Sequence, residues 1–222
     1  MHRCLGSLAL LVLLAASCPA SSLPEAVVAL EVFEPPAPGR VSEAAPPRFV
    51  LLPDGTAFVG GTSHLASGRL EKDAIKDLER QVGSVRKLPG LGSSVALGRG
   101  DTRYRLTLAK SLTILATGDP SQAPAQFKPL AALFETLLAF SDPALRPFRP
   151  TQFLLSAREA RIQGGCRSLA FSFPLADAVS APRTLSAEAA SGWPTGASAA
   201  NVCSGDRTYL VALKPLLPGE RP

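Results

Sequence analysis

Apolar residues recur at helical spacing in a charged stretch, residues 70–88. Within it, Ile75, Leu78, Val82 and Val85 share one helical face, and acidic and basic residues alternate on the opposite face. This pattern predicts an amphipathic helix that packs its apolar face against a hydrophobic core. A Pro-Gly pair directly follows the segment and would end the helix there.

A second stretch with helical spacing covers residues 124–140. Phe127, Leu130, Phe134 and Leu137 again fall on one face. The second proline of this segment fits the first turn of a helix, where a missing N–H costs nothing. We therefore predict a second amphipathic helix that begins near this proline.

Before the first helix, the chain has the patterns of strands and turns. Residues 26–33 are rich in β-branched residues and predict a leader strand, whereas the prolines of residues 34–47 predict a loop. In residues 48–60, two apolar runs flank Asp54-Gly55, a strong turn dipeptide, and so predict a β-hairpin.

Between the two helices, the period changes to that of strands. Residues 103–108 alternate polar and apolar positions, and residues 112–117 form a further apolar run. Lys110-Ser111 would be the tight turn between them, and residues 94–98 predict a short additional strand. The order strand, hairpin, helix, hairpin, helix predicts an α+β fold with one or more antiparallel sheets and two amphipathic helices.

The last third of the chain has a weaker pattern. Residues 152–159 and 167–174 predict strands, and residues 208–213 predict the final strand. Residues 176–206 are rich in Ala, Ser and Gly and indicate a loose excursion between strands. We therefore predict a β-rich C-terminal part over residues 146–222.

The N-terminus has the features of an export signal. A short positive segment precedes the uncharged apolar residues 5–16, a run shorter than the roughly 20 residues that a membrane-spanning helix needs. Residues 15–18 resemble a bacterial lipobox, in which Cys18 would be lipidated and anchor the protein to a membrane. The alternative is ordinary cleavage near Ala16 or after Ala20. Either interpretation predicts an extracytoplasmic protein, as a periplasmic or outer-membrane lipoprotein or in secreted form.

These features divide the chain into four predicted parts. A signal peptide covers residues 1–18, and residues 19–47 form a tether that includes the leader strand and the Pro-rich loop. The α+β core covers residues 48–145, and the β-rich part follows it.

Hydrophobic residues make up 46% of the chain, which is too many for a chain that is disordered throughout.

Export changes the meaning of the cysteines. Two of the four lie within the first 18 residues, which leaves Cys166 and Cys203 for the mature protein. An oxidising compartment favours a disulfide between them, which would brace the C-terminal part. By the loop-entropy argument, closing this loop would stabilise the fold by about 3–4 kcal/mol.

Charge and motif content argue against several classes of function. The net charge is +5, but acidic and basic residues are interleaved, so no basic stripe for a nucleic acid is present. His64 is the single histidine beyond the leader and lies in a Gly/Ser/Thr-rich loop, where a solvated side chain is expected rather than a general base. No Gly-x-Ser-x-Gly motif, metal-ligand cluster or cofactor-binding motif occurs. We therefore predict a protein without cofactor or metal that is not an enzyme.

Several segments together carry a family resemblance: the leader strand AVVALEVF, the hairpin FVLLPDGTAFVGG, the helix start RLEKDAIKDL and the ending YLVALKPLLPGE. The chain resembles a group of uncharacterised bacterial secreted proteins and lipoproteins that share a Leu-x-x-Asp-Gly hairpin and a Pro-Leu-Leu-Pro-x-Glu ending. The resemblance covers roughly residues 26–219. It implies an extracytoplasmic location and this fold, and it implies no activity.

The most economical functional hypothesis is a non-enzymatic binding or accessory module of the bacterial cell envelope, with an envelope protein as partner. Trp193 would be an interface anchor if exposed, although a buried core role fits equally well. Arg103 and Arg105 share a strand face that would bind an anion or simply be solvated. The alternatives are a secreted hydrolase of unfamiliar type and an inhibitor of a secreted hydrolase, with a disulfide-braced loop as the inserting element. The pattern predicts no oligomeric state.

Overall fold

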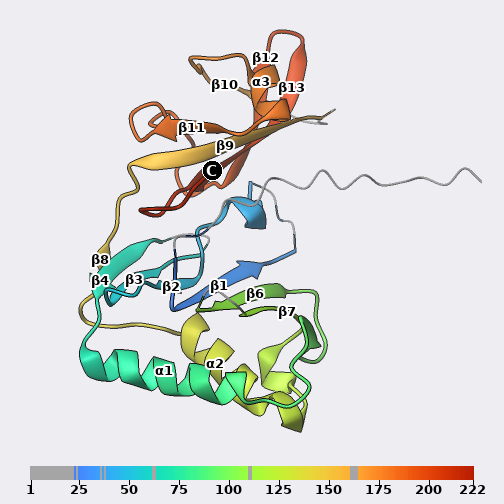
Figure 1. The fold of residues 1–222 in the computed structure, drawn as a ribbon. Coiled ribbons are helices and arrows are strands. Elements are labelled where there is room, and N and C mark those ends of the chain that lie inside the picture. Colours follow the sequence, from blue (N-terminus) through green and yellow to red (C-terminus); the bar gives the residue numbers. More distant parts are fainter. Residues whose placement is uncertain are drawn as a thin grey trace, which may run out of the picture.

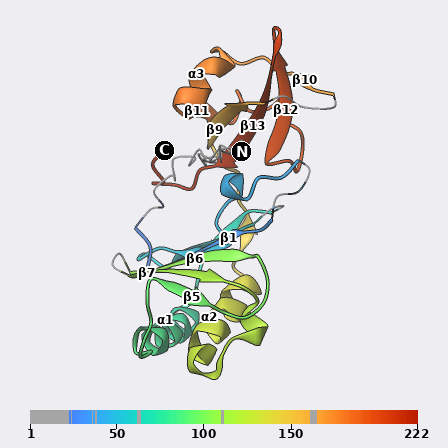
Figure 2. The same cartoon turned by 90° about the vertical axis from the view of Figure 1, so that its right-hand side faces the viewer.

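The protein is described by a computed structural model, which covers residues 23–222 except 24, 36, 38, 62, 63, 110, 111 and 161–164. The predicted signal peptide, the lipidation site Cys18 and the predicted Lys110-Ser111 turn lie outside the described residues. Within them, the α+β prediction is confirmed, with two mixed, mostly antiparallel sheets and three α-helices. Figures 1 and 2 show the two sheets stacked one above the other, with helices on their outer sides.

The first sheet has eight strands in the order β5-β7-β6-β1-β2-β3-β4-β8. Its strands are β1 (Val28–Phe33), β2 (Phe49–Leu51), β3 (Thr56–Val59), β4 (Ala66–Arg69), β5 (Ser94–Ala96), β6 (Arg103–Leu108), β7 (Leu112–Thr117) and β8 (Arg146–Pro147). All pairs are antiparallel except β5 with β7. The predicted leader strand thus becomes a central strand, paired with β2 on one side and β6 on the other.

The turn between β2 and β3 is built as its sequence predicts. Gly55 has a φ of 86°, a left-handed conformation that glycine adopts without a Cβ clash. The backbone N–H of Thr56 donates to Asp54 Oδ1 at 2.9 Å, and the Thr56 hydroxyl donates to Asp54 Oδ2 at 3.0 Å. These hydrogen bonds favour the carboxylate and lower the pKa of Asp54.

Helices α1 (Lys72–Arg86) and α2 (Lys128–Leu138) cover one face of this sheet, as Figure 1 shows. Leu78, Val82 and Val85 of α1 are buried there, together with Leu130, Phe134 and Leu137 of α2. A proline lies in the first turn of α2, as predicted. Three short 3-10 helices, η1 (Ser42–Ala44), η2 (Pro120–Gln122) and η3 (Ala125–Phe127), complete the region.

The second sheet has five strands in the order β10-β12-β13-β9-β11, and α3 covers its outer face. The elements are β9 (Gln152–Glu159), β10 (Arg167–Ser168), α3 (Leu175–Ser180), β11 (Arg183–Ser186), β12 (Ala199–Ser204) and β13 (Arg207–Pro215). Leu155 and Val211 of the sheet pack with Leu175 and Ala178 of α3 in a second hydrophobic core.

Two predictions for this region are wrong. Residues 167–174 are a strand only at Arg167–Ser168, and residues 176–206 are not a loose excursion, since they contain most of α3 and all of β11 and β12. The helix is too short to show a helical period, and β11 buries only Leu185. A third error lies in the first region, where β4 occupies the end of the Gly/Ser/Thr-rich segment that predicted a loop.

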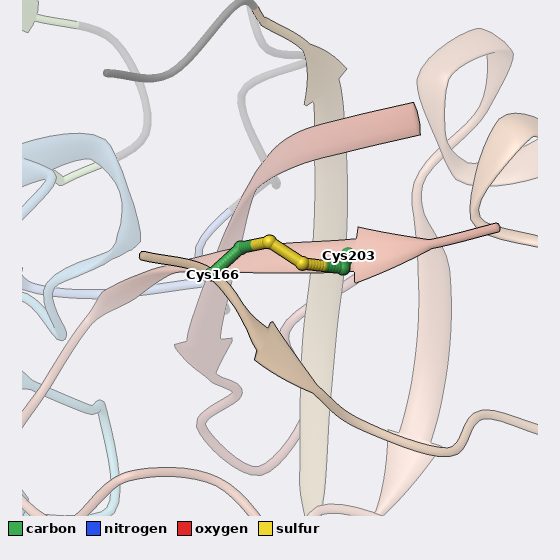
Figure 3. The surroundings of a disulfide bond; sticks show 2 residues. All are labelled: Cys166 and Cys203. Atoms are coloured by element: carbon green, nitrogen blue, oxygen red, sulfur yellow. A yellow bond between two sulfur atoms is a disulfide. The ribbon is translucent and has the colours of Figure 1, made fainter. Parts of the chain in front are cut away.

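The predicted disulfide between Cys166 and Cys203 is confirmed, with a Cα–Cα distance of 5.4 Å (Figure 3). Cys166 directly precedes β10, and Cys203 lies in β12. Because β10 and β12 pair in parallel over only two residue pairs, the disulfide holds a very short edge strand to the sheet.

The C-terminal tail joins the two sheets. Leu217 packs with Ala29, Val50 and Phe58 on the face of the first sheet that points away from α1 and α2. Both figures place the C-terminus between the two sheets. A buried ion pair fixes the tail: Lys214 Nζ lies 2.6 Å from Glu220 Oε1, and the Leu217 backbone N–H donates to Glu220 Oε2 at 2.9 Å.

Candidate functional site

A cavity of about 320 Å³ lies where the second sheet meets the loops of the first region. One wall comes from η1 and the residues after it, and a second comes from residues before β4. The third wall comes from β9, β13 and the loop between β11 and β12. The cavity therefore belongs to both regions, and neither region alone would enclose it. Its volume is at the lower end of the range typical of small-molecule sites, roughly 300–1,000 Å³.

Trp193 lines this cavity from the loop between β11 and β12. Its indole is half-buried and packs on the second core, and its Nε1–H donates to the Ala197 carbonyl at 2.8 Å. The side chain is thus held in place by a hydrogen bond within its own loop. Of the two alternatives for Trp193, the structure shows neither a free surface anchor nor a fully buried plug, but a fixed ring at the wall of a cavity.

Hydrogen bonds connect two of the loops that form the walls. The Ser198 hydroxyl accepts from the Val41 N–H at 2.8 Å and donates to the Val41 carbonyl at 3.3 Å. The backbone N–H groups of Ser198 and Ala199 both donate to the Gly39 carbonyl at 3.2 Å. The Pro-rich loop is thereby attached to the Trp193 loop, so the relative position of these walls is set before any ligand binds.

The wall before β4 is fixed by aromatic packing beneath it. Leu65 lines the cavity and also packs in the cluster that contains Phe58 and Phe148. The Phe148 N–H donates to the Leu65 carbonyl at 2.8 Å, and the two phenylalanine rings meet edge to face at 5.3 Å. His64, the neighbouring lining residue, is exposed, as its loop sequence predicts, and so lies on the solvent side of this wall.

The cavity is largely apolar. Phe153 and Leu213 contribute apolar side chains, and four prolines add further apolar surface: Pro46, Pro150, Pro194 and Pro215. Apart from His64, none of the described residues that line it has an ionisable side chain. Such a site would bind an uncharged apolar group by burying its surface, with a small number of polar contacts to orient it.

Arg103 and Arg105 lie on a different surface and do not line the cavity. They are on β6, on the sheet face opposite the two large helices. Arg105 Nη1 lies 3.1 Å from Glu31 Oε2, and its guanidinium lies 5.1 Å from the centre of the Phe33 ring. Arg103 Nη2 lies 3.8 Å from Glu43 Oε1. Each arginine already has a carboxylate partner, which favours a solvated sheet face over an anion site.

The other residues with a shifted pKa belong to turns and to the core. Hydrogen bonds from the Ser121 hydroxyl and the Ser121 backbone N–H lower the pKa of Asp119 within a turn, and burial raises the pKa of Tyr104. None of these residues lines the cavity. Among the described residues, no group of three or more His, Cys, Asp or Glu side chains could hold a metal ion. Within the same residues, no helix has the length and hydrophobicity needed to cross a membrane.

Sequence reasoning singled out Trp193 but missed most of its neighbours in the cavity. His64 was predicted to be a solvated loop residue, and Phe153 was only one position of a predicted strand. These residues are far apart in the chain, and no local spacing connects them. A signal did exist, because prolines gather in residues 34–47 and small residues gather in residues 190–198, two of the segments that contribute to the walls.

No known protein family, curated protein or solved structure matches this chain. The resemblance to bacterial secreted proteins and lipoproteins therefore stays a prediction, and the functional argument depends on the cavity itself.

Proposed function

We propose that this protein is a non-enzymatic binding module of the bacterial cell envelope and that the cavity between its two regions is the binding site. One observation carries the proposal: a partly open cavity of about 320 Å³ with apolar walls, one of which holds Trp193 in a fixed position. Tryptophan is enriched among the residues that contribute most to binding energy. An envelope protein that presents an apolar group is the partner we expect, and a free small molecule would use the same contacts.

The walls support binding because they are already in place. Hydrogen bonds join the Pro-rich loop to the Trp193 loop, and aromatic packing supports the wall at Leu65. A site that needs little ordering loses less entropy when a ligand binds. Prolines in the walls add to this rigidity, since their φ angle is fixed by the ring.

The location is part of the proposal. A disulfide is consistent with an extracytoplasmic compartment, where such bonds form and persist. We further propose that the mature protein is either anchored through a lipid on Cys18 or released after ordinary cleavage. Palmitate labelling of the wild type and of Cys18→Ser in a bacterial host separates the two. Label that depends on Cys18 supports the anchor, and its absence supports the released form.

The binding proposal is tested with N-phenyl-1-naphthylamine, an uncharged apolar dye that fluoresces when it leaves water. Trp193 is the single tryptophan of the chain, so energy transfer from tryptophan to the dye reports binding close to it. We expect saturable binding with energy transfer. Absence of any saturable signal at micromolar to millimolar dye would contradict the proposal.

Two matched variants locate the dye. Thr195 is an exposed residue of the cavity wall, and Thr184 is an exposed residue of β11 that does not line it. Thr195→Tyr should obstruct the cavity and weaken dye binding about tenfold or more, the loss expected when an apolar group is excluded from its site. Thr184→Tyr adds the same side chain elsewhere and should leave binding unchanged. Equal binding by both variants would place the dye outside the cavity.

A further inference from the structure

We infer a ligand class for the cavity: a small aromatic group that carries a hydrogen-bond acceptor at one end, with a carboxylate as the preferred acceptor. The aromatic body would lie against Trp193 and Phe153, and the acceptor end would meet His64 at the solvent side. This inference rests on the proposed function, because it assumes that the cavity binds a ligand. It adds which ligands the cavity accepts and which residue selects among them.

The aromatic part of the inference follows from the shape and chemistry of the walls. Trp193 and Phe153 are both half-buried and line the same cavity, so a ligand can cover the ring surface that the protein leaves open. Aromatic groups bury a large area at a low cost in conformational entropy and favour offset or edge-to-face contacts with other rings.

The polar part follows from the few polar side chains available. The Ser198 hydroxyl already accepts from and donates to Val41. Thr195 is exposed, with a hydroxyl that both donates and accepts. His64 is the one ionisable side chain among the described lining residues, and an imidazole always has at least one N–H to donate. The exposed position of His64 lets a bound ligand keep its charged end in contact with water.

Charge near this end of the cavity favours an anion. The guanidinium of Arg48 donates from Nη1 to the Gly60 carbonyl at 2.7 Å, and from Nε and Nη2 to the Leu138 carbonyl. Its described contacts are therefore with carbonyl groups rather than with a carboxylate. Gly61, which also lines the cavity and lies three positions before His64 in the chain, is beside Arg48: a Cβ at Gly61 would be 3.6 Å from Arg48 Nη1. No acidic residue is among the described lining residues, so a carboxylate there meets a positive field.

The test uses three compounds that share a ring system and differ at one end: 1-naphthaleneacetic acid, 1-naphthaleneacetamide and 1-naphthalenemethylamine. Their affinities are measured by titration calorimetry with the full mature chain. We expect the acid to bind most tightly, the neutral amide less tightly and the cationic amine most weakly. For His64→Leu, the Kd of the acid should rise about tenfold, the loss expected for one hydrogen bond to a charged group. The Kd of the amine should change little.

His64→Gln keeps a donor and should recover part of the lost affinity for the acid. His64 is exposed, so both variants are expected to fold, and circular dichroism checks this. Equal Kd values for all three compounds, or tightest binding of the amine, would overturn the inference while leaving the proposed function intact. The same holds if the acid binds His64→Leu as well as wild type, or if the dye binds and no naphthyl compound does. Failure of the dye and of all three compounds would instead contradict the proposed function.

Discussion

The two regions of this molecule reach a folded state by different means. In the first region, long rows of Leu, Val, Ile and Phe from α1, α2 and the first sheet form one large core. In the second region, the core is smaller and uses alanines and half-buried aromatic rings, and a disulfide holds its edge strand. We infer from this comparison that the first region is stabilised mainly by burial, whereas the second also depends on a covalent bond and on contacts with its neighbour.

The largest expected effect is in the first core. Phe134 is fully buried and meets Tyr104 with a centroid distance of 5.1 Å. Phe134→Ala should lower the free energy of unfolding by about 3–5 kcal/mol, because the removed ring leaves a cavity that its neighbours fill only in part. Phe127, half-buried at the end of η3 and directly before α2, is the matched control, and Phe127→Ala should cost clearly less. Equal losses in urea unfolding would contradict the claim that burial dominates this region.

The buried ion pair of the tail should have the next largest effect. Glu220→Gln removes the negative charge beside Lys214 and should cost about 3–5 kcal/mol, since it breaks a buried ion pair. Glu188→Gln, at an exposed position of the second region, should change stability by less than about 0.5 kcal/mol. Limited proteolysis of the tail gives a second measurement. A tail in Glu220→Gln that resists protease as wild type does would show that the pair does not hold the two regions together.

The disulfide provides a third test. The double variant Cys166→Ser/Cys203→Ser should lose about 3–4 kcal/mol, the entropy of closing this loop in the unfolded chain. Trp193 lies in the second region, so its fluorescence should report the loss. Reductant should destabilise the wild type and leave the double variant unchanged. If the variant unfolds at the same urea concentration as the wild type, then the second region does not depend on its covalent bond.

The smallest expected effect concerns the turn between β2 and β3. The pKa of Asp54 is lowered in the folded state, mainly by the Thr56 N–H, so its contribution to stability is present above the unfolded pKa of about 3.9. This contribution is lost as the pH falls through the folded pKa. Asp54→Asn should therefore lower Tm slightly at pH 7, and the difference from wild type should close below about pH 4. Asp101→Asn, in an exposed loop, is the control. A difference that is the same at pH 3 and pH 7 would contradict this account of the turn.

The same comparison explains how far the sequence could be used to predict the structure. In the first region, the apolar residues from Ile75 to Val85 and from Leu130 to Leu137 recur at helical spacing, because each helix packs one long face against the core. In the second region, α3 buries only Leu175 and Ala178, and β11 buries only Leu185, which is too few residues for a period to be detected. The disulfide was predictable because only two cysteines follow the predicted signal peptide. The cavity was not, because its walls come from segments that local spacing does not connect.

The most direct test of the central claim, that binding occurs at the junction of the two regions, is a nuclear magnetic resonance titration of the indole N–H of Trp193. The chain has a single tryptophan, so this group gives one signal without ambiguity. We predict that N-phenyl-1-naphthylamine shifts this signal in a saturable way, together with the backbone amides of His64 and Phe153, while the amides of Arg103 and Arg105 stay in place. An unchanged indole signal with saturable shifts on β6 would contradict the account and assign binding to the open face of the first sheet.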